Sequence, residues 1–217
     1  LLVDRGEDVA ADRWTAKEAR FDDVRALLAA VPDPAVVVLG PPGSGKSTLL
    51  RHAELDTAHA NLQGEDPHDT ITFFIQFNQY KARLGHTLPD PGDWLAARWS
   101  ARHPALPALD DLLAQGRMLL LLDALNEMPA ASEREFRERV RDWKDWLVRM
   151  VGEQPGNRVV FSCRTLDYSA PLSTPALRVP QVRIEPLSDE QVHAFLRVSN
   201  PALAERTWAE IAGTPEL

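Results

Sequence analysis

A short glycine-rich segment has the residue types and the spacing that bind phosphate groups. It matches the pattern GxxxxGK[ST] at every fixed position and consists of Gly40, Pro41, Pro42, Gly43, Ser44, Gly45, Lys46 and Ser47, followed by Thr48. Glycines let backbone N–H groups curl around a phosphate, and a helix that begins here points its positive end at the same anion. Lys46 is then placed to neutralise the β- and γ-phosphates of a nucleotide, Ser47 to ligate Mg²⁺, and Thr48 to extend the cradle. The pattern predicts a nucleotide site, because an apolar run precedes it and a helical pattern follows it.

Two carboxylates follow a second apolar run at 118–122. Asp123 ends this run, and Glu127 lies four residues later. Ligands bind at the carboxyl ends of the strands in parallel sheets, so we expect Asp123 to hold Mg²⁺ through water, beside the phosphates. Glu127 is placed to orient or deprotonate an attacking water. The alternative is a strand that merely ends in an acidic turn, and the glycine-rich segment in the same chain disfavours it.

An arginine, Arg164, closes a third apolar run at 159–163. At the same edge of the sheet its guanidinium would reach the γ-phosphate, which makes it a candidate catalytic residue. The alternative is a surface arginine that pairs with a nearby carboxylate. Cys163, the only cysteine of the chain, is most simply a small core residue, because no partner histidine is apparent.

The composition is that of a globular, intracellular protein. The chain has 217 residues, 44% of them hydrophobic, which is enough for one domain and part of a second. A single cysteine excludes an internal disulfide and favours a reducing, cytoplasmic location. The apolar runs are too short to cross a membrane, and the N-terminus lacks a signal-peptide pattern. A formal net charge of −8 argues against direct binding of nucleic acid.

Apolar runs alternate with helical patterns along the chain. Strands are expected at 35–39, 71–77, 118–122, 159–163 and 182–185. Helices are expected at 15–31, 46–59, 94–101, 109–115 and 132–151, with two more opening at capping patterns near 188 and 200. Strands separated by helices predict an α/β fold, a doubly wound five-stranded parallel sheet. Five tryptophans in helical patterns are expected to pack in the core or between domains: Trp94, Trp99, Trp143, Trp146 and Trp208.

The motifs also divide the chain. We expect residues 1–31 to be a helical lead-in or linker, 32–187 to be the nucleotide domain, and 188–217 to be the start of a small helical domain. Because the chain begins without Met, we expect it to be a piece of a longer protein.

The three motifs together resemble those of the NACHT-type STAND NTPases, relatives of the AAA+ ATPases. The resemblance rests on the P-loop 40–48, on the run that ends Asp123-Ala124-Leu125-Asn126-Glu127, and on the run that ends Ser162-Cys163-Arg164. It covers about residues 20–217, and the segment 185–188 looks like that family's exit into a small helical domain. The resemblance implies a P-loop NTPase topology in which the strand of Arg164 lies between the P-loop strand and the strand of Asp123.

The resemblance also implies individual roles. Lys46 and Ser47 would hold phosphate and Mg²⁺, Asp123 would be the Walker B acid, Glu127 the catalytic carboxylate, and Arg164 the sensor residue.

Two further positions are judged against the family pattern. The segment 213–215 is similar to the family's Gly-x-Pro element, whose proline, here Pro215, would pack on the adenine of ATP or ADP. The preference for adenine is taken from the resemblance alone. The family usually has two acids where this chain has Asn126 and Glu127, so the asparagine weakens the expectation of rapid hydrolysis.

The function implied by the resemblance is a nucleotide-controlled switch. In this family a compact ADP state opens and oligomerises when ATP binds, and an effector and a sensor domain flank the module. We therefore expect a slow ATPase within a larger signalling or defence protein, a homo-oligomer on activation. Two alternatives stay open: a module that binds nucleotide without hydrolysing it, and a P-loop kinase, for which the loop 81–91 is not decisive.

Overall fold

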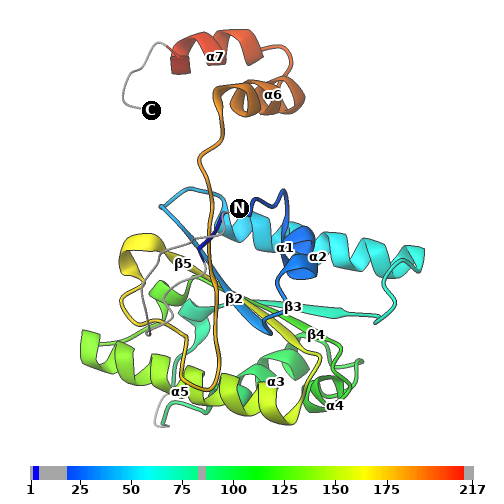
Figure 1. Cartoon of the computed structure of the whole chain (residues 1–217), viewed down its shortest axis with the longest axis vertical. Coiled ribbons are helices and arrows are strands. Elements are labelled where there is room, and N and C mark those ends of the chain that lie inside the picture. Colours follow the sequence, from blue (N-terminus) through cyan, green and yellow to red (C-terminus); the bar gives the residue numbers. More distant parts are fainter. Residues whose placement is uncertain (1, 5–18, 83–86, 213–217) are drawn as a thin grey trace. The chain divides into compact units, whose positions relative to one another are not determined.

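The computed structural model describes residues 2–4, 19–82 and 87–212 of the chain. The chain forms two compact units, Leu1–Ile184 and Glu185–Leu217. The first unit contains a sheet with helices on both faces, and the described part of the second contains two helices (Figure 1). The expected domain roles on either side of residue 187 stay a prediction.

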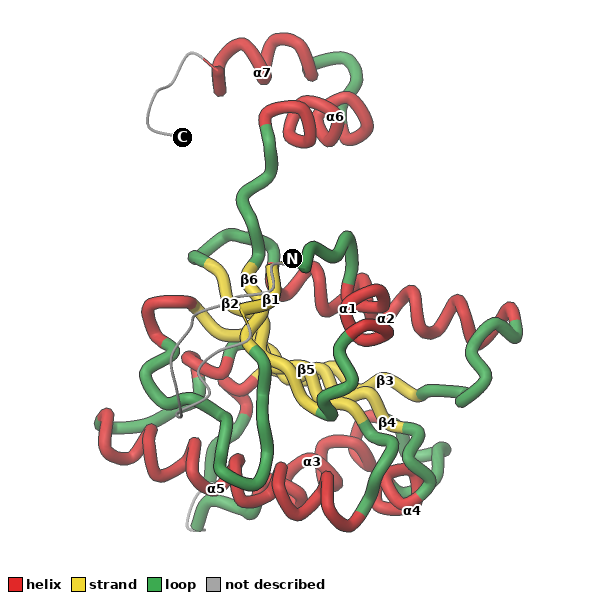
Figure 2. Tube along the Cα trace, in the orientation of Figure 1, coloured by secondary structure: helices red, strands yellow, loops and turns green. Residues whose placement is uncertain are grey.

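The described part of the first unit is built on one sheet with the strand order β1-β6-β2-β5-β4-β3 (Figure 2). Its strands are β1 (Leu2–Asp4), β2 (Ala35–Gly40), β3 (Ile71–Gln76), β4 (Met118–Asp123), β5 (Arg158–Arg164) and β6 (Gln181–Arg183). The five strands from β6 to β3 are parallel, which confirms the predicted fold class. β5 lies between β2 and β4, as the resemblance implied.

Both edges of the sheet differ from the prediction. β1 adds a short antiparallel strand beside β6, and three residues are too few for a periodic pattern to reveal. β6 ends at Arg183, earlier than the predicted strand 182–185. β3 likewise ends at Gln76, because Phe77 begins a short 3-10 helix.

Helices cover both faces of the sheet, as a doubly wound fold requires. In the first unit the structure describes α1 (Val24–Ala30), α2 (Lys46–Gln63), α3 (Pro91–Arg102), α4 (Leu109–Ala114) and α5 (Glu133–Glu153). α1 and α2 pack on one face through a core that includes Leu27, Leu50 and Val160. α3, α4 and α5 pack on the other face (Figure 1). β2 and β4 are buried along their whole lengths, because both of their faces are covered.

The first helix begins later than predicted. The helix expected over 15–31 is α1, which starts at Val24 because the Asp23 carboxylate accepts a hydrogen bond from the Ala26 amide. Phe21 therefore precedes the helix. The predicted capping pattern at 15–18 lies outside the described residues.

The second unit contains α6 (Asp189–Ser199) and α7 (Ala204–Ala212). The capping box predicted for α6 is present, with Ser188 and Gln191 exchanging hydrogen bonds. The prediction that a helix opens at Asn200 is wrong. The amide of Asn200 donates to the carbonyl of Leu196 and ends α6, and α7 begins only at Ala204.

An aromatic cluster fixes α5 against the sheet. Trp143 of α5 is fully buried and meets Phe77, Tyr80, Trp94 and Phe161 in edge-to-face contacts. Such contacts add to the free energy gained from burying the rings. The expected packing role is confirmed for the four tryptophans of α3 and α5: Trp94, Trp99, Trp143 and Trp146. In the second unit, Trp208 is half-buried and stacks on His193.

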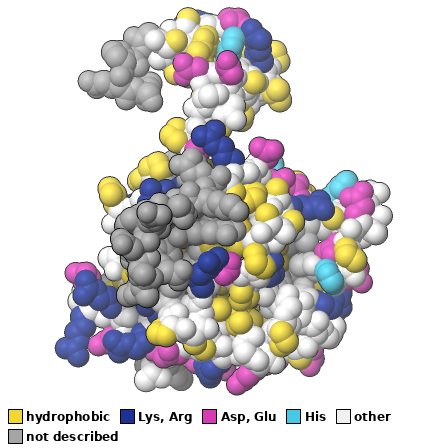
Figure 3. All heavy atoms as spheres, viewed as in Figure 1, with side chains coloured by type: hydrophobic (Ala, Val, Ile, Leu, Met, Phe, Trp, Pro, Cys, Tyr) yellow, Lys and Arg dark blue, Asp and Glu magenta, His cyan; other side chains and the backbone are white. Residues whose placement is uncertain are grey.

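On the face shown in Figure 3, Lys and Arg side chains are interspersed with Asp and Glu side chains. On α5 three arginines pair with glutamates one turn away, among them Arg139 with Glu135. Pairs of this kind on an exposed helix face contribute only a few tenths of a kcal/mol each.

We expect the stability of the sheet to depend on the packing of α5. Leu147 on α5 is fully buried, so Leu147→Ala should lower the free energy of unfolding by about 2–5 kcal/mol through lost burial and a cavity. Leu62→Ala on α2 is the matched control, because this leucine is 85% exposed, and it should change stability by less than about 0.5 kcal/mol. Urea unfolding curves of the two variants measure both values. Similar losses in the two variants would contradict the assigned packing.

Candidate nucleotide-binding site

The glycine-rich segment forms a tight turn between β2 and α2. Gly43 and Gly45 have φ angles of 76° and 84°, a region that side chains with a Cβ rarely adopt. A Cβ at Gly40 would lie 2.5 Å from Oγ of Ser44, so any larger residue there would displace the serine side chain. Ser47 lies in the first turn of α2, which begins at Lys46. The turn and the helix end together have the geometry that the motif requires.

Lys46 curls back over its own loop. Its Nζ donates to the carbonyl oxygens of Gly40 at 2.9 Å and Pro41 at 2.7 Å, and to Oγ of Ser44 at 3.3 Å. Burial, and next to it the positive charge of Arg164, lower the pKa of this ammonium group. The site therefore concentrates positive charge on the side where a phosphate would bind.

Asp123 ends β4 as a buried carboxylate. It is 1% exposed, and its Oδ1 accepts a hydrogen bond of 2.6 Å from the hydroxyl of Ser162 on β5. Its Oδ2 accepts a longer bond of 3.3 Å from the amide nitrogen of Gln76 on β3. These three side chains form a polar row across the ends of three neighbouring strands.

The chain turns sharply after Asp123. Ala124 has φ 60° and ψ 56°, a left-handed conformation that is uncommon for residues other than glycine. Its amide donates a 2.8 Å hydrogen bond to Oγ of Ser162. This hydrogen bond to β5 stabilises the strained conformation of Ala124, as is common where a turn shapes a site.

Glu127 and Arg164 meet at the entrance of the site. The Arg164 guanidinium lies 3.5 Å from the Glu127 carboxylate and 3.9 Å from that of Asp167, and the first two side chains are 43–44% exposed. The amide of Arg164 also donates to Oδ1 of Asn126 at 3.2 Å. Arg164 thus does pair with nearby carboxylates, as the alternative interpretation expected, while it still faces the predicted site. Asn126 supplies an acceptor that connects the turn after β4 to the end of β5.

A cavity of about 320 Å³ brings most of the predicted residues together. Its lining contains Pro42, Gly43, Gly45, Lys46, Ser47, Thr48, Asp123, Ala124, Asn126, Glu127, Ser162 and Arg164. Gly40, Pro41 and Ser44 shape the loop without lining the cavity. Pro215 lies outside the described residues, so its expected contact with adenine stays a prediction.

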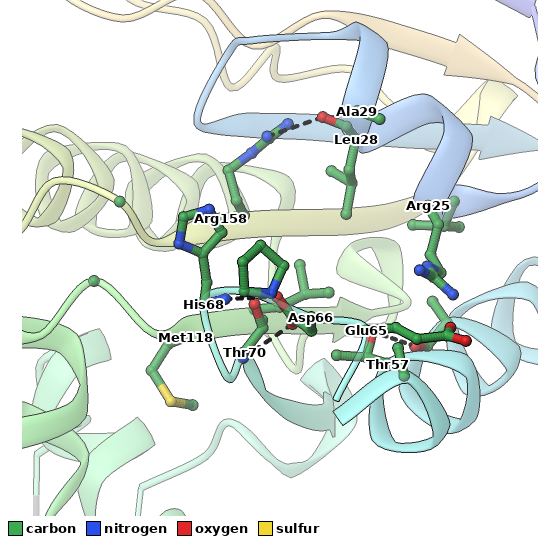
Figure 4. Close-up of a pocket in the computed structure, with 17 residues that line it drawn as sticks. Arg25, Leu28, Ala29, Thr57, Glu65, Asp66, His68, Thr70, Met118 and Arg158 are labelled. Carbon is green, nitrogen blue, oxygen red and sulfur yellow. Dashed lines mark hydrogen bonds between the residues drawn. The ribbon is translucent and has the colours of Figure 1, made fainter. Parts of the chain in front are cut away.

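A second cavity, of about 470 Å³, is larger but lies away from these motifs (Figure 4). It lies between α1, the second half of α2 and the beginnings of β4 and β5. Figure 4 shows Arg158 reaching from β5 toward α1, where its guanidinium donates to the carbonyls of Leu28 and Val31. Ligands of open parallel sheets bind at the carboxyl ends of the strands, so the smaller cavity is the candidate nucleotide site.

The residues of the smaller cavity fit a nucleotide with Mg²⁺. An ideal Cβ placed on Gly43 or Gly45 would meet no other atom within 4 Å, so these glycines leave open space in the lining. The Ser47 hydroxyl and the Asp123 carboxylate are the hard oxygen donors that Mg²⁺ prefers. Among the described residues, no group of three or more His, Cys, Asp or Glu side chains forms a metal site made of protein alone.

Two polar residues of the site were not among the sequence predictions. Ser162 is fully buried and interrupts an otherwise apolar run two positions before Arg164, and Gln76 ends β3. A buried hydroxyl in a core strand requires a hydrogen-bond partner, and that requirement is a signal present in the sequence. The sequence does not show that this partner is Asp123, because the contact between Ser162 and Asp123 depends on the register between β4 and β5.

The fold and the site together define the class of the protein as a P-loop NTPase. A glycine-rich turn follows the central strand, an acid ends a strand two positions away in the sheet, and an arginine ends the strand between them. The family model of the NACHT domain matches residues 34–201, which is more than half of the chain. The chain therefore belongs to the NACHT family.

Two solved structures are similar to this chain. One chain of the HORMA:CdnC:Trip13 complex of E. coli MS115-1 is similar over 90% of this chain and 64% of its own length, with 18% identity and a TM-score of 0.53. A Walker-type ATPase of Pyrococcus abyssi is similar over 81% of this chain and 54% of its own length, with 16% identity and a TM-score of 0.44. The chain thus spans less than two thirds of either one. At these identities the first likeness supports the fold alone.

No curated protein is detectably similar to this chain in sequence. Among the described residues, no helix is both long and apolar enough to cross a membrane.

We expect the thiol next to Arg164 to be unreactive in the folded chain. Cys163 is fully buried, and this burial raises the pKa of its thiol to about 11, so at pH 8 only about 0.1% would be thiolate. A thiol-reactive disulfide such as DTNB should label the folded chain at least about 100-fold more slowly than the chain unfolded in guanidinium. Rapid labelling of the folded chain would show that the end of β5 opens.

Proposed function

We propose that this chain is an ATP- and Mg²⁺-binding switch module that hydrolyses ATP slowly. The observation that supports it best is the single cavity lined by Lys46, Ser47, Asp123, Glu127 and Arg164, because each has the chemistry of one part of a nucleotide site. Membership of the NACHT family supports the same function. In this proposal the nucleotide state controls oligomerisation, and the module acts between effector and sensor domains of a larger signalling or defence protein.

The basic and hydroxyl side chains bind and orient the nucleotide. Lys46 exchanges its contacts with the loop carbonyls for contacts with the β- and γ-phosphates, and the backbone amides of the glycine-rich turn hold the same oxygens. Ser47 and Asp123 would hold Mg²⁺, which neutralises the charge that develops on the phosphates. Thr48 extends the hydroxyl lining of the cavity.

The Glu127–Arg164 ion pair would link the catalytic carboxylate to the bound nucleotide. Glu127 acts on water only when its carboxylate is free, and in this structure it faces the Arg164 guanidinium at 3.5 Å. A γ-phosphate attracts the same guanidinium, so binding of ATP would draw Arg164 away and free Glu127. ADP offers no γ-phosphate, and the pair would persist.

A second candidate function is a module that binds nucleotide without turnover. Asn126 favours it, because the position that usually holds an acid in the family here holds an amide that binds the backbone of Arg164. Both candidates need the same binding residues. Glu127 distinguishes them, because only hydrolysis requires its carboxylate.

We expect Glu127→Gln to separate binding from hydrolysis. The amide keeps the shape of the side chain but cannot accept a proton, so ATP affinity should stay within about 3-fold while the rate of phosphate release falls by about 100-fold or more. Glu138→Gln, on the exposed face of α5, is a matched control that should leave the rate unchanged. Equal turnover in Glu127→Gln and in the unmodified chain would refute the catalytic assignment.

Removing the P-loop cation should abolish binding. Lys46→Ala deletes the ammonium group that would neutralise two phosphates, so calorimetry should detect at least about a 100-fold loss of ATP affinity. Lys144→Ala on α5 removes a lysine outside the cavity and should have no effect. Unchanged ATP affinity in Lys46→Ala would contradict the nucleotide site itself.

The switch requires its own measurement. Size-exclusion chromatography of the longer protein with ADP, and separately with a non-hydrolysable ATP analogue, should show a larger species only with the analogue. The same elution volume with both nucleotides would contradict control of oligomerisation.

A further inference from the structure

Ser162 brings a fully buried hydroxyl to the end of β5. A buried hydroxyl without a hydrogen-bond partner destabilises the fold, so its contacts decide whether it is tolerated. Its Oγ donates to Oδ1 of Asp123 at 2.6 Å and accepts the amide of Ala124 at 2.8 Å. The hydroxyl therefore has its hydrogen and one lone pair committed to two consecutive residues of the neighbouring turn.

These two bonds hold β4 and β5 together where the strand pairing stops. The last residues that pair between β4 and β5 are Leu122 and Phe161, so Asp123 and Ala124 lie beyond the β4–β5 ladder. Backbone pairing alone would leave the carboxylate free to rotate and the left-handed Ala124 without support on this side. Ser162 supplies the contact that the ladder lacks.

The second partner of Asp123 does not replace this contact. Both bonds are accepted by the same carboxylate, but the bond from Gln76 to Oδ2 is 3.3 Å long and the bond from Ser162 to Oδ1 is 2.6 Å, and the shorter bond is the stronger one. The orientation of the carboxylate is thus set mainly from β5. Ser162 also lies two residues before Arg164, on the same side of the strand, since side chains alternate along β5.

We propose that Ser162 is a positioning residue for metal-dependent nucleotide binding, because it holds the Asp123 carboxylate in the orientation that receives Mg²⁺. The inference rests on the proposed function, since it assigns Asp123 to Mg²⁺. Partners that orient a metal-binding carboxylate typically change metal affinity by about 10–100-fold when they are removed. Ser162 would act through Asp123 and would not itself contact the nucleotide.

The test compares ATP affinity with and without Mg²⁺. Ser162→Ala should weaken binding of ATP by about 10–100-fold in Mg²⁺, and by less than about 3-fold in EDTA, since Lys46 and the loop amides remain. Ser162→Thr keeps the hydroxyl and should restore the Mg²⁺-dependent affinity to within about 3-fold of the unmodified chain. Ser162→Cys preserves the volume with a weak donor, and it provides the same comparison if the alanine variant is too unstable to purify.

A matched control removes a different buried hydroxyl. Thr57 on α2 is buried and donates to the carbonyl of Ala53, away from the nucleotide cavity, so Thr57→Ala should keep both affinities. Equal affinities in Ser162→Ala and the unmodified chain would overturn the proposal, as would equal losses in Mg²⁺ and EDTA, which indicate a structural role. If the unmodified chain binds no ATP in Mg²⁺, the proposed function itself fails, and the inference fails with it.

Discussion

The site depends on one buried charge at the end of an apolar strand. Asp123 follows five apolar residues of β4 that are buried on both faces, and its own carboxylate is almost fully covered. An ionised carboxylate in such surroundings is costly unless it is hydrogen-bonded or faces a cation. Ser162, Gln76 and the adjacent cavity meet that requirement, and the strand order brings them there.

The parallel arrangement explains why residues far apart in sequence meet. All five parallel strands point the same way, so the ends of β2, β4 and β5 lie along one edge. In the register of the sheet, Gly40 lies opposite Arg164, and Gln76 lies opposite Asp123. The phosphate-binding Lys46 then follows β2, the two carboxylates Asp123 and Glu127 end or follow β4, and Arg164 ends β5. Net charge plays little part, since an acidic chain still builds a local positive field from Lys46, Arg164 and backbone amides.

Sequence reasoning predicted the parallel strands, the position of β5 between β2 and β4, and most residues of the cavity, because each rests on a local pattern or a family motif. Three features could not be predicted from the sequence. The contact between Ser162 and Asp123 depends on strand register, the left-handed Ala124 is not a glycine, and the pairing of Glu127 with Arg164 depends on a turn that no pattern specifies. The predicted start of a helix was wrong where it rested only on the type of the capping residue, as at Asn200. Pro215 lies outside the described residues and stays a prediction.

The aromatic cluster around Trp143 has a consequence for spectroscopy. The four described tryptophans of the first unit all lie on α3 and α5, in the core on the face of the sheet opposite to α2. Their emission reports whether that core is closed, and it is separated from the P-loop by the sheet itself. Nucleotide binding at the P-loop is therefore expected to change the emission of these four tryptophans little. A ribose- or base-labelled fluorescent analogue, which carries its own chromophore into the cavity, is the suitable optical probe for this chain.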